Sequence, residues 1–265
     1  YYIWYKVTGD SNHNDVAATY AATATISKRT VTPTAPTLTT GTLTYNGTAK
    51  TLANAGSTTA GGTMYYYVST SSTTPTFSTS TWKQSIDTKT DAGTYYIFWY
   101  DYVSDTANNS GSNINSVKSL DSRTIGNATI TVTAPDQSYT YNGNPQGVAI
   151  TATSVNSQAV TIRYGTESGS YNLTSAPTAT NVADSKTIYY QVTAPNHTTR
   201  TGSYTLTITK ANASVTAPTA NTLTYNGSAQ ELVTAGSTAD GTLQYRLGAS
   251  GTYSTDIPTD RKSVE

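Results

Sequence analysis

The sequence predicts a mainly β protein made of tandem small domains, and three observations carry this prediction. The 265 residues include 22 tyrosines and many threonines, and both residue types favour strands. Apolar side chains gather in short runs separated by Gly, Asn and Pro, as in strands joined by turns. A Tyr-Asn-Gly motif recurs at residues 45–47, 141–143 and 225–227, which are 96 and 84 residues apart. Solenoid units span only roughly 20 to 50 residues, so each period is expected to hold its own core.

Disorder is the alternative that the polar composition raises, because only 11% of the residues are charged and Thr, Ser, Gly and Asn are frequent. Disordered segments are poor in aromatic and β-branched residues, whereas this chain concentrates Tyr, Trp, Ile and Val in runs of strand length. The sequence therefore favours a folded chain.

Strands and corners follow from the local patterns. The predicted strands are, in chain order, Tyr1–Val7, Thr63–Val68, Thr94–Tyr102, Thr187–Val192, Tyr204–Ile208 and Thr242–Leu247. Asn-Gly supplies the two residues that a type I′ turn requires, because both of its central positions have positive φ. Each Tyr-Asn-Gly is therefore predicted to form the corner of a β-hairpin.

Repeated junction sequences set the expected boundaries. Thr-Ala-Pro occurs at residues 34–36, 133–135 and 216–218, and Ile-Ser-Lys or Ile-Thr-Lys closes the segment before it at 26–28 and 208–210, with a degenerate version at 124–126. Proline cannot donate to a strand ladder, so one unit ends before it and the next begins. The expected division is a truncated repeat at 1–28, a first complete repeat with an inserted loop at 29–125, a second complete repeat at 126–210, a truncated repeat at 211–259 and a tail at 260–265.

The ordered motifs resemble one known family. Tyr-Asn-Gly-x-Ala-Gln is followed by Ala-Gly-Ser-Thr, a Tyr-rich strand, Ile-Pro-Thr, Ala-Gly-Thr-Tyr and a closing Ile-Thr-Lys, with the best copies at 223–258 and 91–96. This frame resembles the MBG-type (mostly β-grasp) repeats of bacterial surface proteins over nearly the whole chain. The second complete repeat diverges most, with Asn181-Val182-Ala183-Asp184 in place of the usual Asn-Ala-Gly-Thr.

The resemblance implies β-grasp-like domains, and immunoglobulin-like β-sandwich repeats are the alternative fold. It also implies an extracellular module of adhesin-like or cell-wall proteins, commonly without an assigned ligand.

The tail at 260–265 is expected to be non-native. Asp260-Arg261-Lys262-Ser263-Val264 can be back-translated as GATCGGAAGAGCGTC, a common sequencing-adapter string. No function is placed there.

Charge and cysteine content exclude several classes of site. The formal net charge is zero and the charges are scattered, so no basic stripe is present to bind nucleic acid. No apolar run is long enough to span a bilayer, so no membrane contact is expected in this stretch, and a signal peptide or anchor is expected outside it. Cysteine is absent, which excludes disulfides and thiolate metal sites. No cofactor is expected.

No catalytic constellation is evident. The two histidines, His13 and His197, occupy the same repeat position, so they are interpreted as loop residues rather than as parts of one metal or catalytic site. The hydroxyls lack a Gly-x-Ser-x-Gly elbow, and the acidic residues sit singly at predicted turns. The sequence therefore predicts no enzyme activity.

An inserted segment, residues 101–121, is rich in oxygen donors that calcium prefers. The donors are Asp101, Asp105, Asn108, Asn109, Asn113 and Asn115. They lack the Asp-x-Asp-x-Asp-Gly spacing and a bidentate Glu, so a solvated surface loop is expected and no metal is assigned.

The aromatic strands offer the one candidate ligand surface. In residues 1–7, alternation places Tyr1, Ile3 and Tyr5 on one face and Tyr2 and Trp4 on the other. One face must be core, and the second could stack on sugar rings. The candidate stacking residues are Tyr2, Trp4, Trp99 and Tyr189. The competing interpretation, which we favour, is that both faces are buried or that a neighbouring loop or short helix covers one of them.

The functional expectation is a non-catalytic spacer in the repeat or stalk region of a bacterial cell-surface, cell-wall-attached or secreted adhesin-like protein, with neighbouring repeats of the same chain as its contacts. The alternative is a module that binds a host or environmental glycan, or a protein ligand, through exposed Tyr and Trp side chains.

Overall fold

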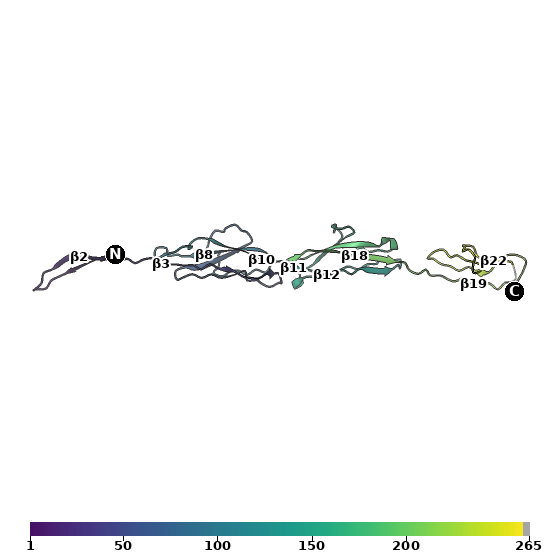
Figure 1. Ribbon diagram of the computed structural model, residues 1–265, viewed down its shortest axis with the longest axis horizontal. Helices are drawn as coiled ribbons and strands as arrows, with labels where there is room; N and C mark the ends of the chain where they lie inside the picture. The colour runs from purple at the N-terminus through teal and green to yellow at the C-terminus, as the bar shows by residue number, and fades with distance from the viewer. Residues whose placement is uncertain (262–265) are drawn as a thin grey trace. The chain divides into compact units, whose positions relative to one another are not determined.

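The computed structural model describes residues 1–261 and is mainly β (Figure 1). Within these residues the only helical segments are two 3₁₀ turns, η1 (Val155–Ser157) and η2 (Val182–Asp184). No helix in this range is long and apolar enough to cross a membrane. Of the expected tail, residues 262–265 lie outside the described part.

The chain divides into two compact units. The first comprises Tyr1–Thr133, Thr151–Arg163 and Tyr190–Gly202. The second comprises Ala134–Ile150, Tyr164–Tyr189 and the residues from Ser203 onward.

The first complete repeat contains one four-stranded sheet and two short strand pairs. Its strands are β3 (Arg29–Thr30), β4 (Thr37–Leu38), β5 (Leu43–Thr44), β6 (Ala53–Asn54), β7 (Thr63–Ser69), β8 (Gly93–Tyr102), β9 (Asn109–Ser110) and β10 (Lys118–Gly126). The sheet has the order β5-β10-β8-β7, in which β5 is parallel to β10 and the other neighbours are antiparallel. The pair β4–β6 is antiparallel and the pair β3–β9 is parallel.

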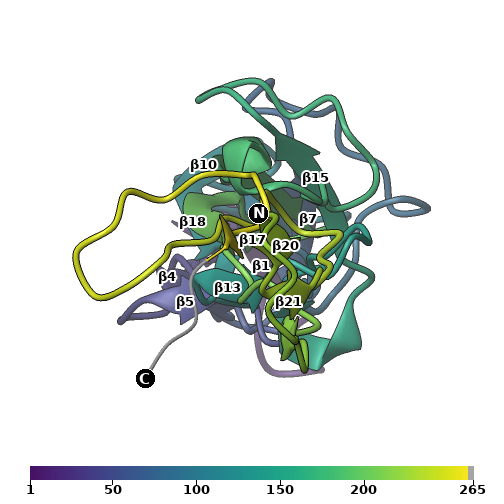
Figure 2. The same ribbon diagram turned by 90° about the vertical axis from the view of Figure 1, so that its right-hand side faces the viewer.

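The second complete repeat reproduces this plan. Its strands are β11 (Ala128–Thr129), β12 (Thr131–Thr133), β13 (Gln137–Thr140), β14 (Thr151–Thr153), β15 (Thr161–Gly165), β16 (Lys186–Thr193), β17 (His197–Thr198) and β18 (Arg200–Thr209). Its sheet has the order β13-β18-β16-β15, with β13 parallel to β18; β13, β15 and β18 are labelled in Figure 2. The two similar mixed sheets indicate two repeated small β domains.

The segments at the two ends of the chain form smaller pairings. β1 (Tyr2–Val7) and β2 (Val16–Thr23) make an antiparallel hairpin. β19 (Thr219–Ala220) pairs with β21 (Val233–Thr234), and β20 (Gln230–Glu231) pairs with β22 (Thr259–Asp260). The expected strand at 242–247 does not form: of these residues only Tyr245 bridges to another residue of the described chain, Ser254. Without a neighbouring strand, the backbone N–H and C=O groups of this segment have no ladder in which to pair.

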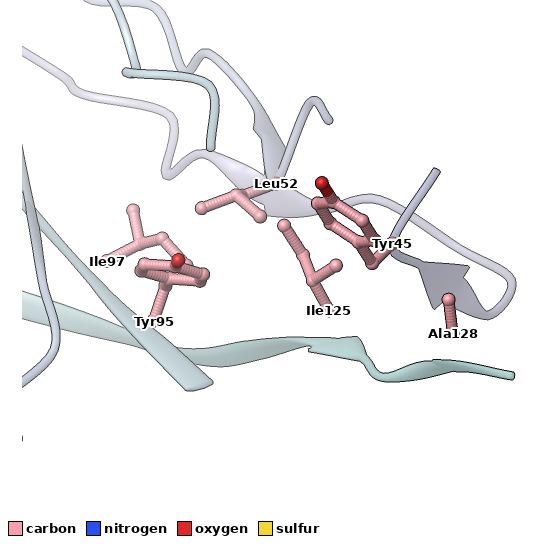
Figure 3. Close-up of a cluster of buried hydrophobic side chains, with 6 residues drawn as sticks. All are labelled: Tyr45, Leu52, Tyr95, Ile97, Ile125 and Ala128. Carbon is pink, nitrogen blue, oxygen red and sulfur yellow. The ribbon is translucent and has the colours of Figure 1, made fainter. Parts of the chain in front are cut away.

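The core of the first complete repeat lies under its sheet. Tyr45, Leu52, Tyr95, Ile97 and Ile125 are buried together, and Figure 3 shows their side chains pointing toward one another. A second buried cluster joins Met64 and Tyr66 from β7 to Trp99 from β8. These side chains alternate along their strands, as a sheet with one face on the core requires.

The Tyr-Asn-Gly corners differ from the expected type I′ hairpins. Among the turn residues only the glycines have positive φ, +81°, +81° and +79° at Gly47, Gly143 and Gly227. The Asn46 side chain instead accepts a hydrogen bond from the Thr48 N–H at 3.0 Å, and the other two copies repeat this bond. An Asx turn satisfies the backbone without positive φ at Asn. The corner leads from β5 in the sheet to β6 in a separate pair, so it does not join two adjacent strands.

We predict that replacing Tyr204 with Phe stabilises the second complete repeat. The Tyr204 hydroxyl is buried and has no hydrogen-bond partner in residues 1–261, so its removal should raise the local unfolding free energy by about 1 kcal/mol. Burial raises the pKa of Tyr204 from 10.0 to about 12. The native repeat therefore favours the neutral phenol, and this contribution is lost as pH rises from 10 toward 12. Hydrogen exchange of peptides covering β18 at neutral pH would measure the first effect, and denaturant unfolding between about pH 9 and 12 would measure the second.

Tyr66→Phe is the matched control, because the equally buried Tyr66 hydroxyl donates to the Gly56 carbonyl oxygen at 3.3 Å. This change should destabilise its repeat. Equal effects of the two substitutions would contradict the assignment of Tyr204 as an unsatisfied hydroxyl.

Candidate functional site

The four candidate stacking residues lie on three strands and differ in exposure. On β1, Tyr2 is 76% exposed and Trp4 is 61% exposed. On β8, Trp99 is only 7% exposed because it packs in the core with Met64. Tyr189, on β16, is half-buried. Open aromatic faces are therefore found on β1, and Trp99 presents none.

The exposed aromatics of β1 are organised by its hairpin partner. The Tyr20 ring on β2 lies 6.4 Å from the Tyr2 ring and 5.6 Å from the Trp4 ring, the latter edge to face. Register shifts between Ile3 and Trp4, and again after Tyr5, interrupt the strict alternation expected from the sequence. Bulges of this kind re-aim side chains on a strand. The result is a small open cluster of three rings.

In the first complete repeat, a loop covers the second face of the aromatic strands. Phe77, from the segment between β7 and β8, stacks on Tyr100 with ring centroids 3.7 Å apart and planes 3° apart. Trp82, from the same segment, is buried against Tyr67 and donates its indole N–H to the Thr76 carbonyl oxygen at 3.1 Å. In this repeat the rings of Tyr67 and Tyr100 are therefore covered by the segment between β7 and β8.

Several of the oxygen donors of residues 101–121 are used within the fold. The Asn115 amide pairs with the backbone of Val103, accepting from its N–H and donating to its carbonyl oxygen, both at 2.9 Å. Asn109 accepts from the Arg29 guanidinium. Asp105 accepts from the side chain and backbone of Asn108, and these bonds lower the pKa of its carboxyl group. Side chains committed in this way act as internal braces of the insert.

Asp101 is the exception within this insert. Its side chain is fully buried; Oδ2 accepts from the Thr58 hydroxyl at 2.8 Å, whereas Oδ1 has no hydrogen-bond partner among the described residues. Within residues 1–261 no group of three or more His, Cys, Asp or Glu side chains gathers that could hold a metal ion.

The two histidines have different environments. His13 is exposed and its Nδ1 lies 2.7 Å from Asp10. Hydrogen bonds from the Asn12 backbone and from His13 lower the pKa of that carboxyl group. His197, expected as a loop residue, is instead buried in β17, where it pairs in parallel with Ala128 of β11. This parallel pair joins β11, the first strand of the second complete repeat, to β17, which follows β16. No local sequence pattern reveals the contact.

Both ring nitrogens of His197 have partners that fix its tautomer. Nδ1 lies 2.6 Å from the Pro195 carbonyl oxygen, which can only accept, so Nδ1 carries the hydrogen. Nε2 lies 2.9 Å from the Val155 nitrogen and accepts its N–H. These two contacts hold the imidazole ring in one orientation, in which it meets the Tyr45 ring edge to face at 5.6 Å.

That ring contact is part of a junction between the two complete repeats, all within the first compact unit. The Asn196 side chain accepts from the Ala92 N–H and donates to the Asp91 carboxylate, both at 2.9 Å. Ala128, the second residue after β10, joins the buried cluster around Tyr45 (Figure 3). We call this set of residues the junction clamp: Tyr45, Asp91, Ala92, Ala128, Asn196 and His197.

Gly47, two residues after Tyr45 of the junction clamp, also lies close to the second complete repeat. A Cβ placed on Gly47 would lie 2.4 Å from the Asn156 side chain of the second complete repeat. The backbone of one repeat therefore approaches a side chain of the next as closely as a glycine allows. Local sequence patterns do not reveal the clamp. Tyr45, Asp91 and Ala92 lie in recurring motifs, but no motif records that they meet Asn196 and His197.

Comparison with known proteins adds no family. No protein-family model matches the chain, and no curated protein matches it significantly.

We predict that proteolysis spares the boundary between the two complete repeats. Residues 123–126 lie in β10 and residues 128–129 in β11, and Ile125 and Ala128 are buried, so cleavage there needs local unfolding. Residues 24–28 and 210–215 are exposed and outside regular structure, so they should be cut first. Brief digestion with a broad-specificity protease, followed by mass spectrometry, gives the order of cleavage. Early cleavage within 123–129 would contradict a closed junction.

Proposed function

We propose that the chain is a non-catalytic structural spacer in the extracellular part of a bacterial surface or secreted protein. The junction clamp is the observation that carries this proposal. A spacer must hold successive domains in a defined order and direction, and relative domain motion is the default unless the interface prevents it. The resemblance to MBG-type repeats supports the bacterial, cell-wall-attached or secreted setting.

The clamp restricts the junction in two physical ways. The Asn196 amide uses its acceptor on one backbone group and its donor on one carboxylate, so it fixes both direction and distance. The chain crosses the boundary without a linker, since β10 ends at Gly126 and β11 begins at Ala128. Gly and Ser linkers behave as flexible coils, whereas this crossing is held by strand pairing on both sides.

Between the two folds that the sequence predicts, the strand arrangement favours an immunoglobulin-like sandwich. A β-grasp sheet packs on an α-helix, and residues 1–261 contain none. The chain also passes from β5 in the sheet to β6 in a separate antiparallel pair, as it does when strands alternate between the two layers of a sandwich. We therefore propose small sandwich-like domains as the finer description.

A glycan- or protein-binding module is the second candidate, and the exposed rings of Tyr2, Trp4 and Tyr20 favour it. Exposed aromatics give stacking platforms. Specific recognition also needs polar groups that converge on the ligand.

We predict that Asn196→Gly loosens the junction while both repeats stay folded. Asn196 has φ +61°, so Gly keeps the backbone unstrained and removes only the side-chain bonds, together worth about 1 to 3 kcal/mol. The chain has no cysteine, so Thr79→Cys and Thr161→Cys would place one spin label in each repeat. Pulsed electron resonance should give a broader distance distribution for Asn196→Gly than for the parent.

The matched control is Asn113→Gly, because Asn113 also has positive φ, +66°, but lies outside the clamp. Its distance distribution should equal that of the parent. An unchanged distribution in the Asn196→Gly chain would remove the main support for a rigid spacer.

We also predict that the chain binds glycans no more tightly than about millimolar, since two or three rings without convergent donors leave little net free energy after the cost of association. Glycan arrays followed by calorimetry would measure this. Micromolar binding that Trp4→Ala abolishes would support the binding module instead.

A further inference from the structure

Each complete repeat begins and ends with a strand that is paired in parallel. In the first complete repeat the first strand, β3, is parallel to β9, and the last strand, β10, is parallel to β5. The second complete repeat has the same arrangement, with β11 parallel to β17 and β18 parallel to β13. The strands at both ends of each repeat are therefore held by a partner that runs in the same direction.

Strand direction decides how these pairs respond to tension on the two ends of a repeat. β3 and β10 lie toward opposite ends of the first complete repeat (Figure 1). Tension pulls β5 toward its own N-terminal end, through β3 and β4, and pulls β10 toward its own C-terminal end. Because β5 and β10 are parallel, these opposite pulls slide one strand along the other, and all of their residue pairs bear the load together.

Antiparallel neighbours respond differently when they are pulled at the two ends that lie side by side. β8 and β10 are such neighbours, and the start of β8 lies opposite the end of β10 at Gly93 and Ile125. A pull on these two ends opens one residue pair at a time, so each pair in turn bears the whole load. The pair β4–β6, which is also antiparallel, is expected to add little resistance for the same reason.

Additional hydrogen bonds close both ends of the parallel pair in the second complete repeat. Four consecutive residue pairs join β13 to β18. Before the first of them, the Asp136 carboxylate accepts from the Thr205 N–H at 2.7 Å. After the last, the Tyr141 N–H donates to the Thr209 carbonyl oxygen at 2.9 Å. A bond at each end of the ladder adds to the number that must break when the two strands slide.

The corresponding pair in the first complete repeat is shorter but is reinforced in a similar way. Two residue pairs join β5 to β10. The Tyr45 N–H donates to the Gly126 carbonyl oxygen at 2.9 Å, and the Arg123 guanidinium donates to the Gly41 carbonyl oxygen just before β5. Buried side chains of β10 and β18 also shield the two pairings from water, which strengthens their hydrogen bonds.

We propose that each complete repeat is a force-bearing module, in which the parallel pair (β5 with β10, or β13 with β18) carries tension between the two ends of the repeat. This function goes beyond that of a spacer, which only sets a distance, and it does not rest on the junction clamp. Both complete repeats continue into further chain on either side, so tension along the chain passes through them. Resistance to forced unfolding depends on the rate of unfolding under load, which the direction of the pull changes.

Single-molecule pulling of the 265-residue chain in two directions tests the proposal. The chain has no cysteine, so pairs of introduced cysteines define the points of attachment. Ser27→Cys with Asn127→Cys pulls the first complete repeat through its own ends. Thr94→Cys with Asn127→Cys pulls instead at the start of β8 and just beyond the end of β10. All three side chains are exposed, so these substitutions leave the core unchanged.

The peak unfolding force should be at least about twofold higher for the first attachment pair, because two residue pairs share the load that a single pair bears in the second. The released length identifies each event. At about 3.6 Å per residue, the first attachment frees at most roughly 360 Å of chain and the second at most roughly 120 Å. The two double variants should have equal denaturant midpoints without attachment, so that direction and not stability sets the difference in force.

The second complete repeat provides a separate test with a matched pair of variants. Asn127→Cys with Lys210→Cys pulls this repeat through its own ends, and the peak force should exceed that of the first complete repeat because four residue pairs share the load. Asp136→Ala removes the bond at the start of the ladder and should lower the force. Asp184→Ala removes a carboxylate that accepts from the Asn181 N–H outside the parallel pair, and it should leave the force unchanged.

Three results would overturn the proposal. The first is a peak force in the first complete repeat that is the same in both directions. The second is a second complete repeat that resists no more force than the first. The third is an equal loss of force in the Asp136→Ala and Asp184→Ala chains, which would show that the load is not carried by the parallel pair.

Discussion

The parallel pairing of the first and last sheet strands is the constraint on which each complete repeat depends. In the first complete repeat Leu43 lies opposite Ile125 and Thr44 opposite Gly126. Because the strands run in the same direction, both finish at the same edge of the sheet. The Tyr45 N–H then donates to the Gly126 carbonyl oxygen at 2.9 Å, so the Tyr-Asn-Gly corner is fixed where the chain leaves the repeat. The clamp with His197 follows from that placement.

The aromatic strands serve packing on both faces in the first complete repeat. Trp99 fills the core on one side, and Phe77 and Trp82 cover Tyr67 and Tyr100 on the other. Large aromatic rings bury much apolar area, and a small domain depends on buried apolar area for its stability. The abundant tyrosines of this chain therefore serve mainly to pack the strands. Exposed rings are found mainly in the hairpin of β1 and β2.

Polar residues perform the positioning that a larger apolar core would otherwise provide. The Asn115 side chain pairs with the Val103 N–H and carbonyl oxygen, as the backbone of a neighbouring strand would. The Asn196 side chain, in the second complete repeat, bonds to Asp91 and Ala92 of the first. These contacts are directional, so they select one geometry where apolar packing alone would permit several. Asn also tolerates the positive φ that position 196 adopts. A high Asn and Thr content therefore accompanies order here and not disorder.

Sequence alone determined the β class, the repeat and most long strands, because alternation, strand-forming residues and recurring motifs are local signals. For example, the aromatic run at 94–102 forms most of β8, and Tyr204–Ile208 lies within β18. It misjudged the Asn-Gly corners, because turn type depends on which strands the corner joins. The burial of Trp99, the position of His197 in β17 and the clamp at Asn196 were decided only by the tertiary structure. Each arises from parallel or long-range pairing between segments distant in the chain, and no local pattern records which segment will be the neighbour.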